Sequence, residues 1–303
     1  MRQKTITNSQ LLDAIRNRAI QFQSTERFAT AQNYLSTARS FSQYILLRGS
    51  AHAQFNAGTV QDYSRYLVTD RKVLRNTQSF YLRFLRAAFT AMGGSAQLFS
   101  NTFTKVEPTR KRALPANVIR KLDSMQLNGR YAMWRDMFLF SFAARGMAFI
   151  DMAYLRNSDI SGGYISYRRH KTGRSLMVRL EPCMQQIISR WSQKSTDYVF
   201  PIIRSTGAKG FAEYQNALSA YNKALRTIAV RVGLTKSGLT TMSSYTARHT
   251  WATQAYQAGV PVSVISEGMG HSTEQVTRIY LAQLSPTLID RYNRTLLHSI
   301  GFR

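Results

Sequence analysis

Apolar residues recur at intervals of three and four positions through the first third of the chain. Four stretches carry this spacing, at residues 8–23, 25–48, 58–71 and 74–94. The period matches one face of an α-helix that packs against a core. The pattern therefore predicts a small bundle of four helices in the N-terminal part of the chain.

Residues that begin or end helices flank these stretches. Ser24 and Thr25 are suited to cap the N-terminus of the second helix, and Gly49 is suited to end it. Gly93-Gly94 closes the fourth stretch. These residues support the boundaries that the apolar spacing indicates.

The periodicity is lost between residues 95 and 115, which contain Pro108, Pro115 and the run Arg110-Lys111-Arg112. Prolines and consecutive charges are typical of an extended connection. A chain of 303 residues is also long enough for two cores. We therefore predict a helical domain at residues 1–98, a basic linker at 99–115 and a second domain at 116–303.

The second domain mixes helical and β patterns. An amphipathic helix is expected after Pro115, and the apolar run from Met133 to Leu155 indicates a buried helix. Residues 159–181 contain two short strand-like runs joined at His170-Lys171-Thr172-Gly173, which predicts a β-hairpin. Helical patterns return after residue 213. The expected fold is mainly α, with a small β-hairpin or sheet in the second domain.

The charge balance indicates what this protein contacts. The chain has 41 Lys and Arg against 15 Asp and Glu, a formal net charge of +26. An excess of this size and sign attracts phosphates, so nucleic acid is the expected partner. Residues 1–98 carry 13 basic and 4 acidic side chains, so the excess is not confined to a tail. Both domains are expected to contact phosphate, with binding that weakens steeply as salt rises.

Basic side chains cluster late in the first domain and again in the linker. The candidates for contact with DNA are Arg71, Lys72, Arg75, Arg83, Arg86, Arg110, Lys111 and Arg112. For those in the first domain, a solvated helix face explains the cluster about as well.

Several other classes of protein are disfavoured. Cys183 is the single cysteine, which excludes an internal disulfide and cysteine-rich metal sites. No paired carboxylates have the spacing that holds two magnesium ions, and no Gly-Lys-Ser/Thr phosphate loop is present, so no metal or other cofactor is expected. The chain also lacks a signal peptide and any run of about 18 apolar residues. We expect a soluble, intracellular protein.

Three residue types with phosphate chemistry stand at fixed separations near the C-terminus. Arg248 is followed by His249, Gly270-His271 lies 23 residues after Arg248, and Tyr280 lies nine residues after His271. This resembles the signature of the tyrosine recombinases, the phage integrase family, which is His-x-x-Arg-His, then Gly-His, then Tyr. The resemblance extends weakly over the chain and implies a two-domain DNA clamp, with a core-binding (SAM-like) domain and a catalytic domain.

The resemblance implies a role for each of these residues. Tyr280 would attack the phosphodiester and form a 3′-phosphotyrosine, and Arg248 and His271 would bind the phosphate. A planar guanidinium suits this role because it stays charged and donates two hydrogen bonds. Lys171, in the hairpin turn, would protonate the leaving 5′ oxygen. His249 is expected to support the site.

Two positions depart from the family pattern. Tyr245 stands where the family has His or Lys, so it can hydrogen-bond a phosphate but adds no charge. Ala148 stands where the first catalytic arginine belongs. We expect Arg145, one helical turn earlier, to supply that guanidinium, with Arg156 as the weaker substitute. Asp151, at the position of the family's acidic residue, is expected to hold an arginine in place.

The implied activity is site-specific recombination through a Holliday junction, leading to integration, excision or inversion. The implied partners are double-stranded DNA with inverted repeats, three further copies of the chain on DNA, and accessory DNA-bending proteins; the free protein would be a monomer or weak oligomer. A cytoplasmic, nucleoid-associated bacterial protein is expected. Two alternatives stay open, namely a type IB topoisomerase and a DNA-binding architectural protein without catalysis.

Overall fold

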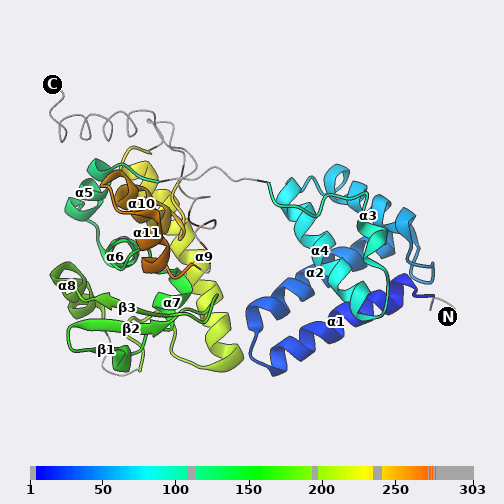
Figure 1. The fold of residues 1–303 in the computed structure, drawn as a ribbon, viewed down its shortest axis with the longest axis horizontal. Helices are drawn as coiled ribbons and strands as arrows, with labels where there is room; N and C mark the ends of the chain where they lie inside the picture. Colours follow the sequence, from blue (N-terminus) through cyan, green and yellow to red (C-terminus); the bar gives the residue numbers. More distant parts are fainter. Residues whose placement is uncertain are drawn as a thin grey trace. The chain divides into compact units, whose positions relative to one another are not determined.

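A computed structural model describes residues 5–107, 113–192, 197–234 and 241–271, together with residues 273, 275 and 277. The chain divides into two compact units, Met1–Thr109 and Arg110–Arg303. Figure 1 labels their helices and strands.

The first unit is the predicted bundle of helices. They are α1 (Asn8–Ser24), α2 (Phe28–Arg48), α3 (Ala57–Thr69) and α4 (Arg75–Ala91), followed by the short 3-10 helix η1 (Ala96–Phe99). Their apolar faces meet in one core that is rich in aromatic rings, with Phe41 and Tyr63 fully buried at a ring-centroid distance of 5.2 Å. The four predicted helices are confirmed.

The connection between α1 and α2 differs from the prediction. Arg27, not Ser24 or Thr25, is the N-cap of α2, and Glu26 before it has a left-handed φ of 56°. The hydroxyls of Ser24 and Thr25 instead donate to the carbonyl of Gln21, at 2.9 and 3.2 Å. Because α1 already uses both hydroxyls in its last turn, neither is available to cap α2.

The chain beyond η1 stays packed on the first unit as far as Glu107. The side chain of Asn76 donates to the carbonyl of Glu107 at 3.0 Å and accepts from its backbone N–H at 2.7 Å. The guanidinium of Arg75 stacks over Phe103, 4.5 Å from the ring centroid. The first part of the segment predicted as an extended linker is therefore held against α4, and residues 108–112 lie outside the described residues.

The second unit is built around α6 (Gly129–Ala143), which packs against α5 (Ala116–Ser124), α8 (Pro182–Trp191), α9 (Gly207–Arg231) and α10 (Thr246–Gln257). Among the described residues of this unit, the remaining elements are α7 (Phe149–Ala153), the 3-10 helix η2 (Asn157–Asp159), α11 (Val262–Gly268) and three strands. The strands β1 (Ile160–Ser161), β2 (Tyr164–Arg168) and β3 (Ser175–Arg179) form one antiparallel sheet in the order β1-β2-β3. The predicted hairpin is β2–β3, and the predicted mainly α fold is confirmed.

The run from Met133 to Leu155, predicted as a buried helix, is broken into α6 and α7. Arg145 and Gly146 have left-handed φ angles of 57° and 73°. The side chain of Ser141 donates to the carbonyl of Met147 at 2.7 Å and so holds the turn against the end of α6. Arg145 therefore lies in a turn, and the expectation that it shares a helix with Ala148 is wrong.

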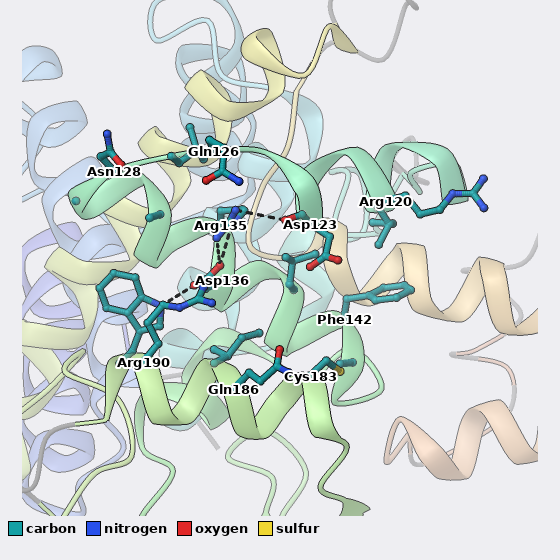
Figure 2. A pocket seen from close by; sticks show the side chains of 18 residues that line it. Arg120, Asp123, Gln126, Asn128, Arg135, Asp136, Phe142, Cys183, Gln186 and Arg190 are labelled. Carbon is teal, nitrogen blue, oxygen red and sulfur yellow. Dashed lines mark hydrogen bonds and ion pairs between the residues drawn. The ribbon is translucent and has the colours of Figure 1, made fainter.

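A buried carboxylate joins α6 to α8. Asp136, which is 1% exposed, accepts from Arg135 at 2.7 Å, from Arg190 at 2.6 Å and from the indole N–H of Trp191 at 2.7 Å. These side chains line a cavity of about 640 Å³ between α5, α6 and α8 (Figure 2). Because a buried charge needs partners, Asp136 fixes α8 against α6.

Candidate active site

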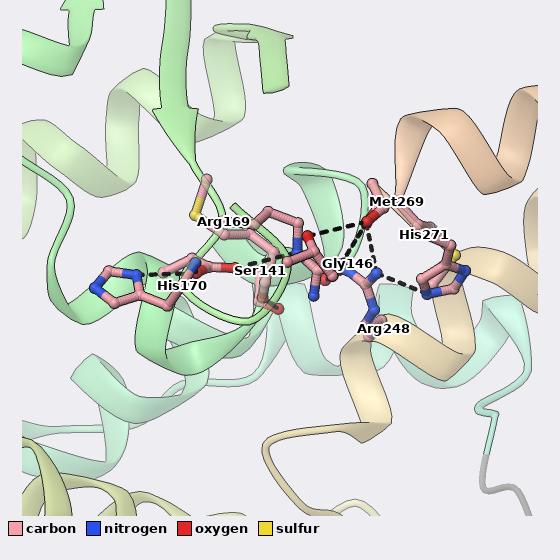
Figure 3. Close-up of polar contacts among 11 residues, drawn as sticks. Ser141, Gly146, Arg169, His170, Arg248, Met269 and His271 are labelled. Carbon is pink, nitrogen blue, oxygen red and sulfur yellow. Dashed lines mark hydrogen bonds and ion pairs between the residues drawn. The ribbon is translucent and has the colours of Figure 1, made fainter. Parts of the chain in front are cut away.

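Arg248 lies in the first turn of α10 and is only 3% exposed. Its Nη1 donates to the carbonyl of Gly146 at 2.8 Å, and its Nη2 donates to the carbonyl of Met269 at 2.6 Å. The same Nη2 lies 2.9 Å from Nε2 of His271 (Figure 3). The fold thus brings the arginine and histidine of the sequence motif into direct contact.

Gly146 has to be glycine for Arg248 to take this position. Besides its left-handed φ, a Cβ at Gly146 would lie 2.7 Å from the Cα of Arg248. Backbone atoms cannot give way as the end of a side chain can, so any side chain at Gly146 would push α10 away. The α6–α7 turn and α10 are therefore fitted to each other at this point.

His271 follows α11 and is 5% exposed. Its Nε2 faces the Arg248 donor, and its Nδ1 lies 2.7 Å from the hydroxyl of Thr277. Since Arg248 has donors only, Nε2 accepts and Nδ1 carries the proton. Burial, and then the charges of Arg248, Arg169 and Lys171, lower the pKa of His271 to about 3. The imidazole is neutral at physiological pH.

Lys171 lies at the exposed tip of the β2–β3 hairpin, as predicted. The tip is bound to the chain around His271: the hydroxyl of Thr172 is 3.5 Å from the carbonyl of Gly270, and Arg174 Nη1 donates to the carbonyl of His271. The hairpin therefore carries Lys171 to the Gly-His turn, near enough for its charge to act on His271.

Asp151, in α7, holds the base of the same hairpin. It is 3% exposed, and its Oδ1 accepts from the backbone N–H of His170 at 2.9 Å and lies 3.1 Å from the Nδ1 of His170. Its Oδ2 lies 3.5 Å from Nε of Arg169, an ion pair without hydrogen-bond geometry. Asp151 faces an arginine, and that arginine is Arg169.

Arg145 lies at the edge of this cluster. Its Nη1 donates to the carbonyl of Met177 in β3 at 3.4 Å, and its Cδ is 3.6 Å from the position that a Cβ on Gly268 would take. Arg145 thus reaches the end of α11 from the α6–α7 turn. Arg156 instead stacks over Tyr198, 5.8 Å from the ring centroid.

Tyr245 and His249 lie together at the start of α10. Tyr245 is the N-cap of the helix and 48% exposed, and its ring centroid is 6.2 Å from that of the half-buried His249. The backbone N–H of His249 donates to the carbonyl of Tyr245 at 3.1 Å, which sets the two side chains one turn apart.

Comparison with protein families shows which family this chain belongs to. A model of the phage integrase family matches residues 114–285, and a model of the phage integrase SAM-like domain matches residues 10–91. The chain belongs to the phage integrase family. It is therefore a tyrosine recombinase, with the core-binding and catalytic parts of that family in order along the chain.

Solved structures of other tyrosine recombinases share the fold. The Tn1549 transposon integrase in complex with transposon right end DNA is 13% identical, with a TM-score of 0.66 over 96% of this chain and 99% of that chain. A lambda integrase tetramer bound to a Holliday junction is 13% identical, with a TM-score of 0.60 over 92% and 78%. XerH bound to a palindromic difH substrate is 12% identical, with a TM-score of 0.60 over 97% of each chain. Among curated protein sequences, none matches this recombinase.

The nucleophile predicted for this recombinase, Tyr280, lies outside the described residues, as do Arg110, Lys111 and Arg112. In the first unit, the predicted DNA contacts Arg71 and Lys72 follow α3, and Arg75, Arg83 and Arg86 lie on α4. Four of them have partners of their own. Arg75 is 3.4 Å from Glu107, and Arg86 is 3.4 Å from the hydroxyl of Thr104. Arg71 donates to the side chain of Gln43, and Arg83 donates to the carbonyl of Ser79 in its own helix at 3.4 Å. Lys72 and Arg83 are exposed.

Among the described residues, no group of three or more His, Cys, Asp or Glu side chains is arranged to hold a metal ion. None of the helices described is both long and apolar enough to cross a membrane.

The motifs of the recombinase family did not point to Arg169, which follows β2 and is 5% exposed. Its neighbour Arg168 is exposed, because successive side chains of a strand point to opposite faces. The signal that could have found Arg169 is that alternation. It assigns one of the two adjacent arginines to the inner face, two residues before Lys171.

Proposed function

We propose that this chain is a site-specific recombinase that cleaves and rejoins DNA through Tyr280, using a phosphate site formed by Arg248, His271 and Lys171. The observation that carries the proposal is the contact between Arg248 and His271 at 2.9 Å, with the hairpin of Lys171 bound to the same turn. These residues are far apart in sequence. Their convergence supports a shared task.

The proposed step forms one bond and breaks one. The phenol of Tyr280 loses its proton to water as its oxygen attacks the phosphorus, the bond from phosphorus to the 5′ oxygen breaks, and Lys171 gives its proton to that oxygen. Arg248 neutralises charge on the non-bridging oxygens as the pentavalent state forms. The 3′-phosphotyrosine keeps the energy of the broken bond, so a 5′ hydroxyl from a partner strand can attack it without ATP.

Supporting roles follow from the positions in the structure. Tyr245, exposed at the start of α10, is proposed to hydrogen-bond the phosphate, and His249 is proposed to orient Tyr245. Arg145 is proposed to reach the phosphate from the α6–α7 turn, and Asp151 is proposed to hold the hairpin that carries Lys171.

The proposed substrate is double-stranded DNA with inverted repeats, bound by four copies of the chain through a Holliday junction, with help from DNA-bending proteins. The free protein would be a monomer or weak oligomer in the bacterial cytoplasm, near the nucleoid.

Residues 1–98 are proposed as the core-binding domain, with Arg71, Lys72, Arg75, Arg83 and Arg86 as its DNA contacts. Residues 116–303 are proposed as the catalytic domain, and Arg110, Lys111 and Arg112 of the linker between them are proposed to bind backbone phosphate. The net charge of +26 supports contact with backbone phosphates along the whole chain.

The test uses nicked suicide substrates that carry the inverted repeats flanking the gene. Wild-type protein is expected to give an SDS-resistant adduct on a 3′ end, and Tyr280→Phe is expected to bind the same DNA without an adduct. Tyr292→Phe, which changes a tyrosine outside the motif, serves as the matched control and should cleave. Tight binding by all three proteins without an adduct would favour a DNA-binding protein that has no catalysis.

A further inference from the structure

The family's first catalytic arginine has no counterpart at its usual position in this chain. That position is Ala148, which here is the N-cap of α7 and has no polar side-chain atom. Cleavage of a phosphodiester without metal nevertheless creates negative charge that positive donors must neutralise. A second guanidinium beside Arg248 is therefore expected from another part of the fold.

Arg169 lies beside Arg248. Its Nη1 donates to the carbonyls of Met269 and Gly270, at 3.0 and 2.9 Å, and Arg248 Nη2 donates to the same Met269 oxygen at 2.6 Å (Figure 3). The two guanidinium groups share one acceptor, so the bonded nitrogens are no more than two hydrogen-bond lengths apart. The fold places them as neighbours next to His271.

The charges around this pair are not balanced. Arg169, Arg248 and Lys171 all act on His271, whereas Asp151 is the carboxylate that the described residues bring against Arg169. Two like charges held close together repel each other unless an anion lies between or beside them. An anion such as a DNA phosphate would supply the missing negative charge.

Arg169 also retains a donor group for such an anion. Its Nη1 is used by the two carbonyls and its Nε faces Asp151, whereas Nη2 makes no hydrogen bond within the part of the chain that the structure describes. The glycine of the Gly-His pair permits this position, because a Cβ on Gly270 would lie 2.7 Å from Cδ of Arg169. Asp151 and the turn hold the guanidinium from two sides, so its direction is fixed.

We propose that Arg169 is a catalytic residue that binds the scissile phosphate through Nη2, beside Arg248, and so supplies a guanidinium that the family takes from the position of Ala148. This inference rests on the proposed function. The rival explanation is that Arg169 only holds the Gly-His turn in place through the two carbonyls.

The two explanations differ in whether the charge on the phosphate matters. Cleavage is measured on a nicked substrate with an ordinary scissile phosphodiester and on one with a methylphosphonate, which is uncharged. Arg169→Ala is expected to cleave the phosphodiester about 100-fold more slowly than wild type. On the methylphosphonate the deficit should shrink to less than tenfold, while DNA affinity measured by fluorescence anisotropy stays within about threefold of wild type on both substrates.

Further variants separate catalysis from folding. Asp151→Asn/Arg169→Met removes both members of the buried pair, which avoids an unpaired carboxylate, and should show the same dependence on phosphate charge as Arg169→Ala. Arg145→Ala removes the other guanidinium proposed to reach the phosphate, and because Arg145 lies at the edge of the cluster its deficit on the phosphodiester is expected to be smaller than that of Arg169→Ala. An equal deficit of the Arg169 variants on both substrates, or full activity of Arg169→Ala on the phosphodiester, would overturn the proposal. Absence of an adduct with wild-type protein would instead contradict the proposed function, and this inference would fall with it.

Discussion

His271 is a buried imidazole that accepts a hydrogen bond from a guanidinium, so protonation would set two positive charges against each other. Its pKa is lowered from 6.5 to about 3, first by burial and then by Arg248. Because the unfolded chain binds the proton more readily, this group costs stability as the pH falls below 6.5. The stability is fully present above pH 6.5 and decreases towards pH 3.

Replacing His271 by Gln removes this titration. The second unit of the wild-type protein is expected to lose up to about 1.4 kcal/mol of unfolding free energy per pH unit more than that of His271→Gln between pH 6 and 4. Urea unfolding at each pH measures the difference. His52→Gln changes an exposed histidine of the first unit and is the control. Parallel pH profiles for wild type and His271→Gln would show that His271 is not held neutral by its surroundings.

Lys171 is proposed as the acid for the leaving 5′ oxygen, a role that the leaving group itself can test. A sulfur in place of the 5′ bridging oxygen departs as a thiolate and needs no proton. Lys171→Ala is therefore expected to cleave the ordinary substrate at least about 100-fold more slowly than wild type, and the sulfur substrate at nearly the wild-type rate. Gel analysis of adduct formation measures both rates. Arg174→Ala, from the same hairpin, should not be rescued; its rescue would argue against a specific role for Lys171.

Among individual residues, the sequence predicted the side chains whose chemistry requires a fixed residue type, such as Arg248 and His271. It could not predict their partners, because Arg248 is held by the main-chain carbonyls of Gly146 and Met269, and any residue type offers a carbonyl. Arg169 was missed for a related reason. The alternation along the hairpin assigns one of two adjacent arginines to the inner face, but no local pattern encodes the distant turn at Met269 and Gly270 on which that face packs.

The α6–α7 turn positions Arg248 by close packing against α10. Gly146→Ala is expected to destabilise the second unit by about 3 kcal/mol, because the methyl group meets the Cα of Arg248 and φ stays left-handed. Gly162, in the β1–β2 turn, also has a left-handed φ, of 56°, but no atom lies within 4 Å of an added Cβ there. Gly162→Ala should therefore cost about 1 kcal/mol. Thermal and urea unfolding compare the two variants. Equal losses would mean that backbone strain alone explains the glycine.

Asp136 fixes α8 against α6 through two donors of α8, Arg190 and Trp191, and it also pairs with Arg135 of its own helix. Asp136→Asn is expected to destabilise the unit by about 3 kcal/mol, since it leaves the buried Arg135 without its carboxylate. Asp123→Asn is a matched control, because Asp123 is exposed and lines the same cavity (Figure 2). Its loss should stay below about 0.5 kcal/mol. A similar effect for both would show that the burial of Asp136 does not matter.

Elements were predicted well where one face of a helix is apolar, as in the first unit, and less well where a helix is apolar on all sides. The run from Met133 to Leu155 gave no sign of its break, because buried helices and buried turns have the same composition. The break depends on the left-handed backbone of Arg145 and Gly146. Glycine allows that conformation without requiring it, so the conformation depends on the packing against α10 and on the hydrogen bond from Ser141 to the carbonyl of Met147.

For the whole molecule, positive charge and two separate cores could be predicted from the sequence, since both depend on composition and on long periodic runs. The net positive charge predicts how the affinity for DNA depends on salt concentration. The logarithm of affinity should fall linearly with the logarithm of salt concentration, and each lost phosphate contact should reduce the slope by about 0.9. Arg83→Ala, which removes an exposed side chain of α4, is expected to show that reduction for every DNA sequence tested.

The matched control for this measurement is Arg16→Ala. Arg16 is exposed like Arg83, but it pairs with Asp13 on α1 at 3.3 Å and is not among the predicted DNA contacts. Both variants lose one charge, so a field that depends only on net charge would change both slopes alike. A smaller slope for Arg83→Ala alone would place α4 on the DNA backbone. Equal slopes for the two variants would instead mean that α4 presents a solvated face, and that the first unit binds phosphate elsewhere.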